Sequence, residues 1–378
     1  MITKKSFDLF NIFFNKILRK KIKIKNSKEY KLFYDFLKNC KLYDYSIDKI
    51  NINKNIKKVL PKSLFISNEI LQSIQYLKLN ENYQIKIKDY LFNIHLYFNE
   101  EINIQIFLQY LCEYLQFLIS LNYHNIIKKK SVKIIEINYY FTDHEKELTK
   151  NFKIPHLFKQ NEINSGSCSH ISKKKEINIW RVEDILKLTL HECIHALELD
   201  FFQDSPEIIK YYQDKYNISS ELINTTEAYT ELLANLLNCF LITQKINGKY
   251  KTFLELIHVE QEFCNYQSQK ILYLSNINTK NTIDINKYTN ILSYFIIRNE
   301  IFQNKLLLLL KNLRKNNYNF KLNEDFWFNY LMKNHNGRKK KSLMKKTYVK
   351  KYLHKNQSTP LIFTMKMNIF DLDINILS

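Results

Sequence analysis

The sequence predicts an α+β fold that is predominantly helical, with a small sheet followed by an all-helical half. Strand-like alternation of apolar and polar residues falls mainly between residues 83 and 180, and long apolar segments with helical spacing follow residue 182. The 378 residues are 45% hydrophobic, which is enough for one large core or two smaller ones. Only 3 Gly and 4 Pro mark turns, so the predicted boundaries are approximate.

The first 80 residues are expected to form several helices, because Lys28–Cys40 and Ser67–Leu79 carry apolar residues three or four positions apart. Tyr83–Phe98 alternates as strands do, with a turn expected near Asp89. An apolar helix is expected at Ile102–Leu121. The sheet therefore begins after an N-terminal helical region.

Two further strands are expected, with a loop between them and four helices after them. The predicted segments are strands at Val132–Thr142 and Glu176–Trp180, a loop at Asn161–Ser169, and helices at Val182–Phe202, Ser220–Ile242, Phe253–Leu274 and Asn290–Leu313. We divide the chain into an N-terminal helical region (1–80), a central domain with the sheet and the helical half (81–320), and a basic C-terminal tail (321–378).

The net charge of +21 is spread along a Lys-rich chain, apart from a cluster at residues 338–355 with nine Lys or Arg. We interpret this cluster as a solvated tail. Non-specific contact with nucleic acid or an anionic surface is the alternative. No zinc-finger spacing or other reading module accompanies the charge, so sequence-specific DNA recognition is not predicted.

The six cysteines form no CxxC pair and no framework spacing, which is typical of free thiols in a reducing compartment. Asp8, Asn11 and Lys16 interrupt the apolar residues near the N-terminus, so no signal peptide is predicted. No apolar stretch is long enough for a transmembrane segment. We expect a soluble, intracellular protein, either cytoplasmic or associated with a virion.

An HExxH motif is formed by His191, Glu192 and His195 within the predicted helix Val182–Phe202. Residues four apart on a helix project from one face, so the two imidazoles can share one zinc ion. Glu192 would lie beside the metal and take a proton from a water whose pKa zinc lowers to about 7. Alternatively, these side chains merely satisfy one another inside a buried apolar helix.

A catalytic zinc site needs a third protein ligand, and the extended pattern with Gly and a third His is absent after His195. Glu227 and Glu231 lie four residues apart on one stripe of a later predicted helix. We predict that Glu227 binds zinc and that Glu231 orients His191 through its free ring nitrogen. Glu231 itself, Glu198, Asp200 and, more weakly, His170 are alternative ligands. Otherwise Glu227 and Glu231 form the wet face of an amphipathic helix.

HECIH followed by EAYTE resembles the gluzincin branch of the zincin metallopeptidases, whose HExxH precedes a helix bearing ExxxD or ExxxE. The order INSGSC, EINIW, HECIH is also similar to predicted metallopeptidases of large DNA viruses of eukaryotes. The resemblance covers Asn161–Ile242. It implies an edge strand beside the active-site helix, near Glu176–Trp180 or the INSGSC block, that binds extended substrate. Glu231 departs from the Asp that this pattern often has.

A group that stabilises a developing oxyanion is expected from a later helix. Tyr294 is our candidate, with Arg298 and His258 as alternatives, although a structural role suits His258 better. Cys193 points away from the histidine face and is expected in the core. Cys168 is expected to pack inside the protein rather than bind zinc.

These residues predict a zinc-dependent metallopeptidase that hydrolyses a peptide or protein substrate, with residues 81–320 as a zincin-like catalytic domain. His191, His195 and Glu227 would hold Zn²⁺, with Glu192 as the general base. The first alternative is a non-catalytic zincin-like protein that binds a partner or nucleic acid through its basic surface. The second is a structural virion or scaffold protein.

Overall fold

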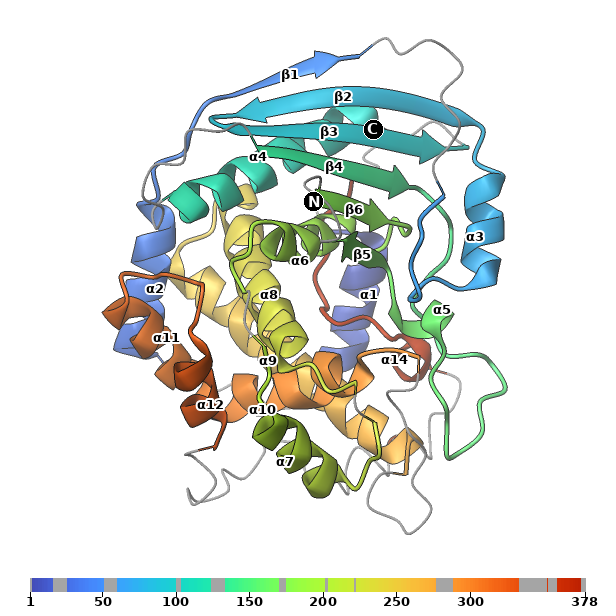
Figure 1. The fold of residues 1–378 in the computed structure, drawn as a ribbon, viewed down its shortest axis with the longest axis vertical. Coiled ribbons are helices and arrows are strands. Elements are labelled where there is room, and N and C mark those ends of the chain that lie inside the picture. The colour runs from blue at the N-terminus through green and yellow to red at the C-terminus, as the bar shows by residue number, and fades with distance from the viewer. Residues whose placement is uncertain are drawn as a thin grey trace.

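The computed structural model describes residues 2–15, 26–50, 60–99, 103–123, 133–169, 175–200, 203–220, 222–276, 288–332, 352 and 359–374. The predicted α+β class is confirmed, since one six-stranded mixed sheet packs against a larger set of helices (Figure 1). The strands are β1 (Tyr45–Lys49), β2 (Leu79–Ile87), β3 (Tyr90–Phe98), β4 (Lys133–Tyr140), β5 (Gly166–Ser169) and β6 (Lys175–Ile179).

The helices lie mainly to one side of this sheet in Figure 1. They are α1 (Lys4–Phe13), α2 (Lys28–Lys38), α3 (Asn68–Gln75), α4 (Ile104–Tyr123), α5 (Gln160–Ile163), α6 (Ile185–Ala196), α7 (Pro206–Tyr216), α8 (Thr225–Lys245), α9 (Tyr250–Leu274), α10 (Arg298–Glu300), α11 (Leu306–Lys315), α12 (Glu324–Met332) and α14 (Pro360–Phe363). Two π-helical segments, η2 (Leu292–Ile297) and η3 (Ile301–Lys305), flank α10.

The strand order in the sheet is β1-β2-β3-β4-β6-β5. The predicted hairpin is confirmed: β2 and β3 pair antiparallel, and the chain turns between them at Lys88, whose φ is 55°. The β3–β4 and β4–β6 pairs are parallel, and β5 pairs antiparallel with β6. Strand β5 thus forms the edge that lies beside α6, so the INSGSC block, rather than Glu176–Trp180, provides the edge strand.

Strands β3 and β4 divide their buried residues between two cores. On β4, Ile137 and Tyr139 face the main core that contains α4 and α6, whereas the next residue, Tyr140, faces the opposite side. There it packs in a small cluster with Ile70 and Ile74 of α3. The sheet is therefore buried against helices on one face and covered locally by α3 on the other.

Helix α4 is long and apolar enough to cross a membrane, by length and composition alone. In the fold it is a core helix, with Tyr114, Leu115 and Leu118 fully buried. Most of its length is covered by the protein, as the prediction of no transmembrane segment requires.

The helical half is built on α8 and α9, and α8 packs between α6 and α9. Both helices form near the predicted positions. The predicted helix at Asn290–Leu313 differs, because it is divided into η2, α10, η3 and α11. π-helical turns are frequent at functional sites, and η2 contains Tyr294.

Four elements before α8 were missed or assigned wrongly by sequence: β1, α5, β5 and α7. The N-terminal region is not entirely helical, because β1 pairs with β2 at the far edge of the sheet. The predicted loop Asn161–Ser169 contains both the end of α5 and strand β5. Helix α7, which begins after the capping residue Ser205, was not predicted. Strands β1 and β5 and helix α5 have four or five residues each, which is too short to show a clear periodicity.

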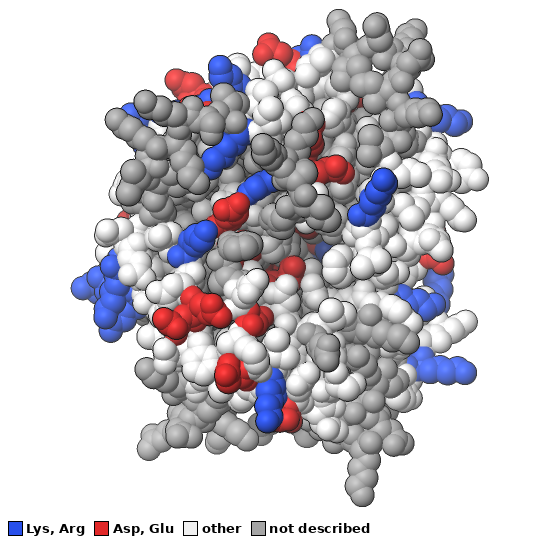
Figure 2. All heavy atoms as spheres, viewed as in Figure 1, with Lys and Arg blue, Asp and Glu red and all other residues white. Residues whose placement is uncertain are grey.

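The prediction of residues 321–378 as a basic tail is wrong for α12 and for residues 359–374. Met365 and Ile369 are fully buried, and Glu260 of α9 accepts hydrogen bonds from the backbone N–H groups of Ile369 and Phe370. Of the basic cluster 338–355, only Tyr352 lies within the described residues. On the face seen in Figure 2, the Lys and Arg side chains of described residues are interspersed with Asp and Glu.

A buried carboxyl on α9 predicts how stability depends on pH. Burial raises the pKa of Glu262 from 4.5 to about 7, so the folded state holds this proton more tightly than the unfolded chain. The contribution of Glu262 to stability therefore falls as the pH rises from about 4.5 to 7. We expect Glu262→Gln to stabilise the protein by up to about 3 kcal/mol at pH 8 and much less at pH 4.5.

Urea unfolding at both pH values measures this difference. Glu255→Gln, on the same helix but with a half-exposed side chain, is the matched control and should change little at either pH. An equal effect of Glu262→Gln at pH 4.5 and pH 8 would contradict the assignment.

Candidate metal centre

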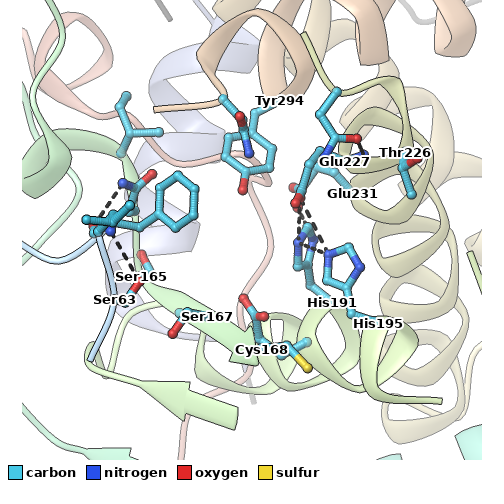
Figure 3. A pocket seen from close by; sticks show the side chains of 18 of the residues that line it. Ser63, Ser165, Ser167, Cys168, His191, His195, Thr226, Glu227, Glu231 and Tyr294 are labelled. Carbon is cyan, nitrogen blue, oxygen red and sulfur yellow. Dashed lines mark hydrogen bonds and ion pairs between the residues drawn. The ribbon is translucent and has the colours of Figure 1, made fainter. Parts of the chain in front are cut away.

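Helix α6 places His191 and His195 one turn apart on the same face, with their Nε2 atoms 3.2 Å apart (Figure 3). The helix is buried on nearly all sides, and its last turn faces the start of α8. The two imidazoles therefore project together from a rigid element, as the HExxH spacing predicts.

Glu227 reaches the same point from the first turn of α8. The side chain of Asn224 caps this helix by accepting a hydrogen bond from the backbone N–H of Glu227, at 3.3 Å. The Glu227 Oε2 atom lies 3.2 Å from Nε2 of His191 and 3.5 Å from Nε2 of His195. Of the proposed third ligands, it is Glu227 that the fold brings to the histidine pair.

These three distances match a tetrahedral zinc site. Two ligand atoms that lie 2.0–2.1 Å from a tetrahedral Zn²⁺ are about 3.3 Å from each other. The three measured separations are 3.2, 3.2 and 3.5 Å. A single cation at the centre would thus meet two imidazole nitrogens and one carboxylate oxygen without rearrangement of the helices.

The outer nitrogens of both histidines are held by carboxylates. Nδ1 of His191 lies 3.0 Å from Oε2 of Glu231, and Nδ1 of His195 lies 2.7 Å from Oδ2 of Asp200. In the neutral imidazoles each Nδ1 is then the donor, which leaves both Nε2 atoms as acceptors. Oε2 of Glu227 is also a buried acceptor and has no hydrogen-bond donor within the described residues. The two Nε2 atoms and Oε2 of Glu227 are thus three acceptors that face one another. Because their lone pairs repel, a cation or added protons must lie between them.

The pKa values of His195 and Glu227 also indicate that positive charge is stabilised between the three acceptor atoms. Burial alone lowers the pKa of His195, but Asp200 and Glu227 outweigh it and raise that pKa well above its ordinary value. Burial likewise opposes the effect of the histidines on Glu227, whose pKa is nevertheless strongly lowered. The carboxylate is therefore charged and stabilises positive charge at this point, whether the charge comes from protons or from a metal ion.

Asp200 reaches His195 because of the way α6 ends. Glu198 adopts the left-handed conformation with φ 57°, and the N–H of Leu199 donates to the carbonyl of Ile194, at 3.0 Å. This turn directs Glu198 outward, where it pairs with Lys175 at 2.7 Å, and returns Asp200 toward the site. Neither Glu198 nor Asp200 therefore belongs to the three-ligand cluster.

Glu231 is the centre of a buried charge network. Its Oε1 atom accepts hydrogen bonds from Lys187 of α6 and from Nη1 of Arg298, the latter at 2.9 Å. Burial opposes ionisation of Glu231, but the two cations and His191 lower its pKa strongly. Arg298, an alternative for oxyanion stabilisation, is instead fully buried and bound to Glu231.

The base candidate Glu192 lies beside the edge strand. A Cβ atom on Gly166 would come within 2.7 Å of Oε1 of Glu192, so any larger residue here would require the Glu192 carboxylate to move. Burial raises the pKa of Glu192, and both histidines oppose that effect. A raised pKa suits a carboxylate that takes up and releases a proton near neutral pH.

The three candidate ligands and Glu192 border a cavity of about 1200 Å³. Tyr294 and the residues of strand β5 also line this cavity. In Figure 3 the Tyr294 hydroxyl points into this space, and its ring centroid lies 6.0 Å from that of His191. Burial raises the pKa of Tyr294 well above its ordinary value, so the phenol keeps its proton and can donate. His258 lies on α9, with Nδ1 2.7 Å from the carbonyl oxygen of Leu254, and does not line the cavity.

The remaining candidates lie apart from the metal cluster. Cys193 is fully buried, as expected for a core residue. Cys168 lines the cavity on β5 but does not belong to the three-ligand cluster. His170 lies outside the described residues. Sequence reasoning also missed the pairing of Asp200 with His195, the contact of Lys187 with Glu231, and the role of Gly166, although Gly166 is one of only three glycines.

The Glu231 network predicts a large effect on stability even without metal. Glu231→Ala would leave Lys187 and Arg298 buried without their carboxylate, which costs about 3–5 kcal/mol. Urea unfolding in the presence of a chelator measures this loss, and Glu255→Ala is the control on a partly exposed ion pair, expected to lose less than about 1 kcal/mol. A loss below about 1 kcal/mol for Glu231→Ala would refute the network's role in stability.

No known protein family and no solved structure matches the chain. Among curated proteins, it is similar to Uncharacterized protein R210 of Acanthamoeba polyphaga mimivirus, with 28% identity over 204 residues. The match covers 47% of this chain and 52% of that protein, so the chain spans about half the length of this relative. The relative is itself uncharacterized and assigns no activity to the residues of the site.

Proposed function

We propose that the protein is a zinc-dependent metallopeptidase. The observation that carries the proposal is the group of three buried acceptor atoms on His191, His195 and Glu227, spaced as the ligands of one tetrahedral Zn²⁺. Two further carboxylates hold the outer nitrogens of both histidines, as is usual for histidines that bind zinc. Glu192 follows His191 directly and borders the same cavity.

The residues of the chain divide the work of peptide hydrolysis. Zinc, when bound, supplies a Lewis acid and lowers the pKa of water to about 7. Glu192 would act as the general base that accepts a proton from the attacking water and would return it to the leaving amine. The protonated hydroxyl of Tyr294 donates a hydrogen bond to the oxyanion that develops on the scissile carbonyl. Asp200 and Glu231 keep both imidazoles in the tautomer that binds metal.

Strand β5 supports a peptide as the substrate. It pairs with β6 on one side, and Gly166–Ser169 line the cavity. Backbone groups on such an edge can add an extended segment as one more antiparallel strand. The segment would then pass the Glu192 carboxylate, which lies directly against Gly166.

We also infer an intracellular setting, cytoplasmic or virion-associated, for this activity. All six cysteines carry free thiols, and Cys112, Cys193, Cys239 and Cys264 are buried in the folded protein. Unpaired thiols are usual in a reducing compartment.

Metal content tests the ligand assignment. The wild-type protein, loaded with zinc and freed of excess metal, is expected to hold about one zinc per chain, measured by inductively coupled plasma mass spectrometry. Glu227→Ala should lower the affinity for zinc by at least about 100-fold, because it removes one of three protein ligands. Glu198→Ala removes a nearby carboxylate that pairs with Lys175 and should bind zinc as the wild type does. Wild-type affinity in Glu227→Ala would exclude Glu227 as a ligand.

Turnover tests the base. Glu192→Gln is expected to retain about one zinc while kcat for a peptide found in a library screen falls by at least about 100-fold, since the amide cannot accept the proton. Glu198→Gln serves as the control at an exposed position of the same region. Undiminished peptidase activity in Glu192→Gln would falsify the mechanism.

A further inference from the structure

The cavity extends from the metal centre toward the beginning of α6. Leu188 lies one turn before Glu192 on that helix, and Met367 belongs to the buried C-terminal segment. Lys146, which follows β4, lines the same cavity. The backbone N–H of Lys146 donates to Glu183 at 2.7 Å, and its carbonyl accepts from the N–H of Met365. Both contacts fix Lys146 at the start of α6.

Lys146 is a buried cation whose ammonium makes no hydrogen bond or ion pair with the residues that the structure describes. The side chain is 1% exposed. Within the described residues, the other buried Lys and Arg side chains donate to carbonyl groups or pair with carboxylates: Arg181, Lys187, Lys270, Arg298 and Lys366. No hydrogen bond or ion pair joins the Lys146 Nζ atom to a described residue, although burying an unpaired charge is costly. Since Lys146 lines the cavity, the partner it lacks can come from there.

The acidic groups near Lys146 each form an ion pair with a different cation. Asp184, Glu183 and Glu231 interact electrostatically with Lys146. Their ion-pair partners are Lys366 at 2.7 Å from Asp184, Lys5 at 3.0 Å from Glu183, and Lys187 together with Arg298 on Glu231. Burial lowers the pKa of Lys146 to about 8, so the ammonium is still mostly charged at pH 7. Lys5 also pairs with Glu145 and Glu147, and Lys366 also lies 3.9 Å from Asp371, so these cations are shared among several carboxylates. No carboxylate of a described residue lies within ion-pair distance of the Lys146 Nζ atom, so the position of a direct counter-ion is open to an anion in the cavity.

We infer that Lys146 recognises a carboxylate of the substrate, either an acidic side chain or the terminal carboxylate, close to the scissile bond. This inference rests on the proposed peptidase function and specifies its substrate. Two turns of α6, roughly 10 Å along the axis, separate Asp184 at its start from His191. One or two residues of extended peptide with a side chain bridge such a distance. The apolar walls at Leu188 and Met367 would surround the aliphatic part of that residue.

The other charged residues that line the cavity restrict where along the bound peptide a carboxylate is accepted. The acidic residues are Glu176, Glu192, Asp200, Asp204, Glu227 and Glu231, and the other lysine, Lys62, is exposed. A carboxylate would be repelled at most places in the cavity and stabilised beside Lys146. The site would therefore select where a negative charge lies in the peptide rather than favour acidic peptides in general.

Matched peptides test the inference on the zinc-loaded full chain. A cleaved library peptide is remade with Glu or Gln at each position flanking the scissile bond, and with a free or amidated C-terminus. We expect one carboxylate form to be cleaved with a kcat/KM about 10- to 100-fold higher than its neutral counterpart, as for a hydrogen bond to a charged group. The Glu/Gln pairs report a side chain, and the acid/amide pair reports the terminus.

Lys146→Met keeps the length of the side chain and removes its charge. It should lower the ratio of kcat/KM for the carboxylate peptide to kcat/KM for its neutral counterpart to nearly one. Lys62→Met, at the exposed lysine of the cavity, should keep the wild-type ratio. No preference in the wild type, or an unchanged preference in Lys146→Met, would overturn the inference and leave the peptidase proposal intact.

A binding measurement separates failure of the inference from failure of the proposed function. Isothermal titration compares acetyl-Ala-Glu-amide, acetyl-Ala-Gln and acetyl-Ala-Gln-amide on the wild type and on Lys146→Met, and requires no turnover. If no peptide is cleaved but one carboxylate probe binds the wild type at least about 10-fold more tightly than Lys146→Met, the carboxylate site stands without the peptidase. Equal binding of all three probes to both proteins would overturn the site itself.

Discussion

The carboxylate of Glu231 is the interaction on which the rest of this structure depends. One oxygen contacts Nδ1 of His191, and the other binds Lys187 of α6 and Arg298 of α10. A single side chain of α8 thus joins three helices and fixes the tautomer of His191, one of the three candidate metal ligands. Separating Glu231 from any of these partners would leave a buried charge without its counter-ion and destabilise the folded state. The three helices are therefore held in one arrangement. The position of Glu227, one turn earlier on α8, follows from that arrangement.

Buried charged groups also fix the position of α6 farther from Glu231. Asp200 holds His195, and the hydroxyl of Thr230 on α8 donates to Asp200. At the other end of α6, Asp184 pairs with Lys366, and its backbone N–H donates to Asp371. Buried charged groups therefore hold both ends of the HExxH helix: Asp200 at its C-terminal end, and Lys366 and Asp371 of the C-terminal segment at its start. This bracing holds the two imidazoles rigidly, which a tetrahedral site with narrow distance limits requires.

Local sequence was enough to predict what depends on periodicity and short-range spacing. The histidine pair, the β2–β3 hairpin and the long helices α8 and α9 could all be predicted, because a helix or hairpin brings residues together at fixed offsets. Glu227 and Glu231 could be selected together because they share one helical stripe. The contact between Asp200 and His195 could not be predicted, because it depends on the left-handed conformation of Glu198. Glutamate seldom adopts this conformation at the end of a helix, where glycine is the usual residue. The burial of residues 359–374 was also missed, since their partners on α9 lie about a hundred positions away.

Lys146 illustrates the same limit and explains why a buried cation there is informative. In a Lys-rich chain no single lysine stands out from sequence, and most lysines of the described residues are exposed. Only the fold shows that Lys146 is enclosed while its acidic neighbours are committed elsewhere. A structural role alone would favour an apolar residue of similar volume, because a buried charge without a partner destabilises the folded state. A positive charge in this place is therefore better explained by a negatively charged group that enters the cavity.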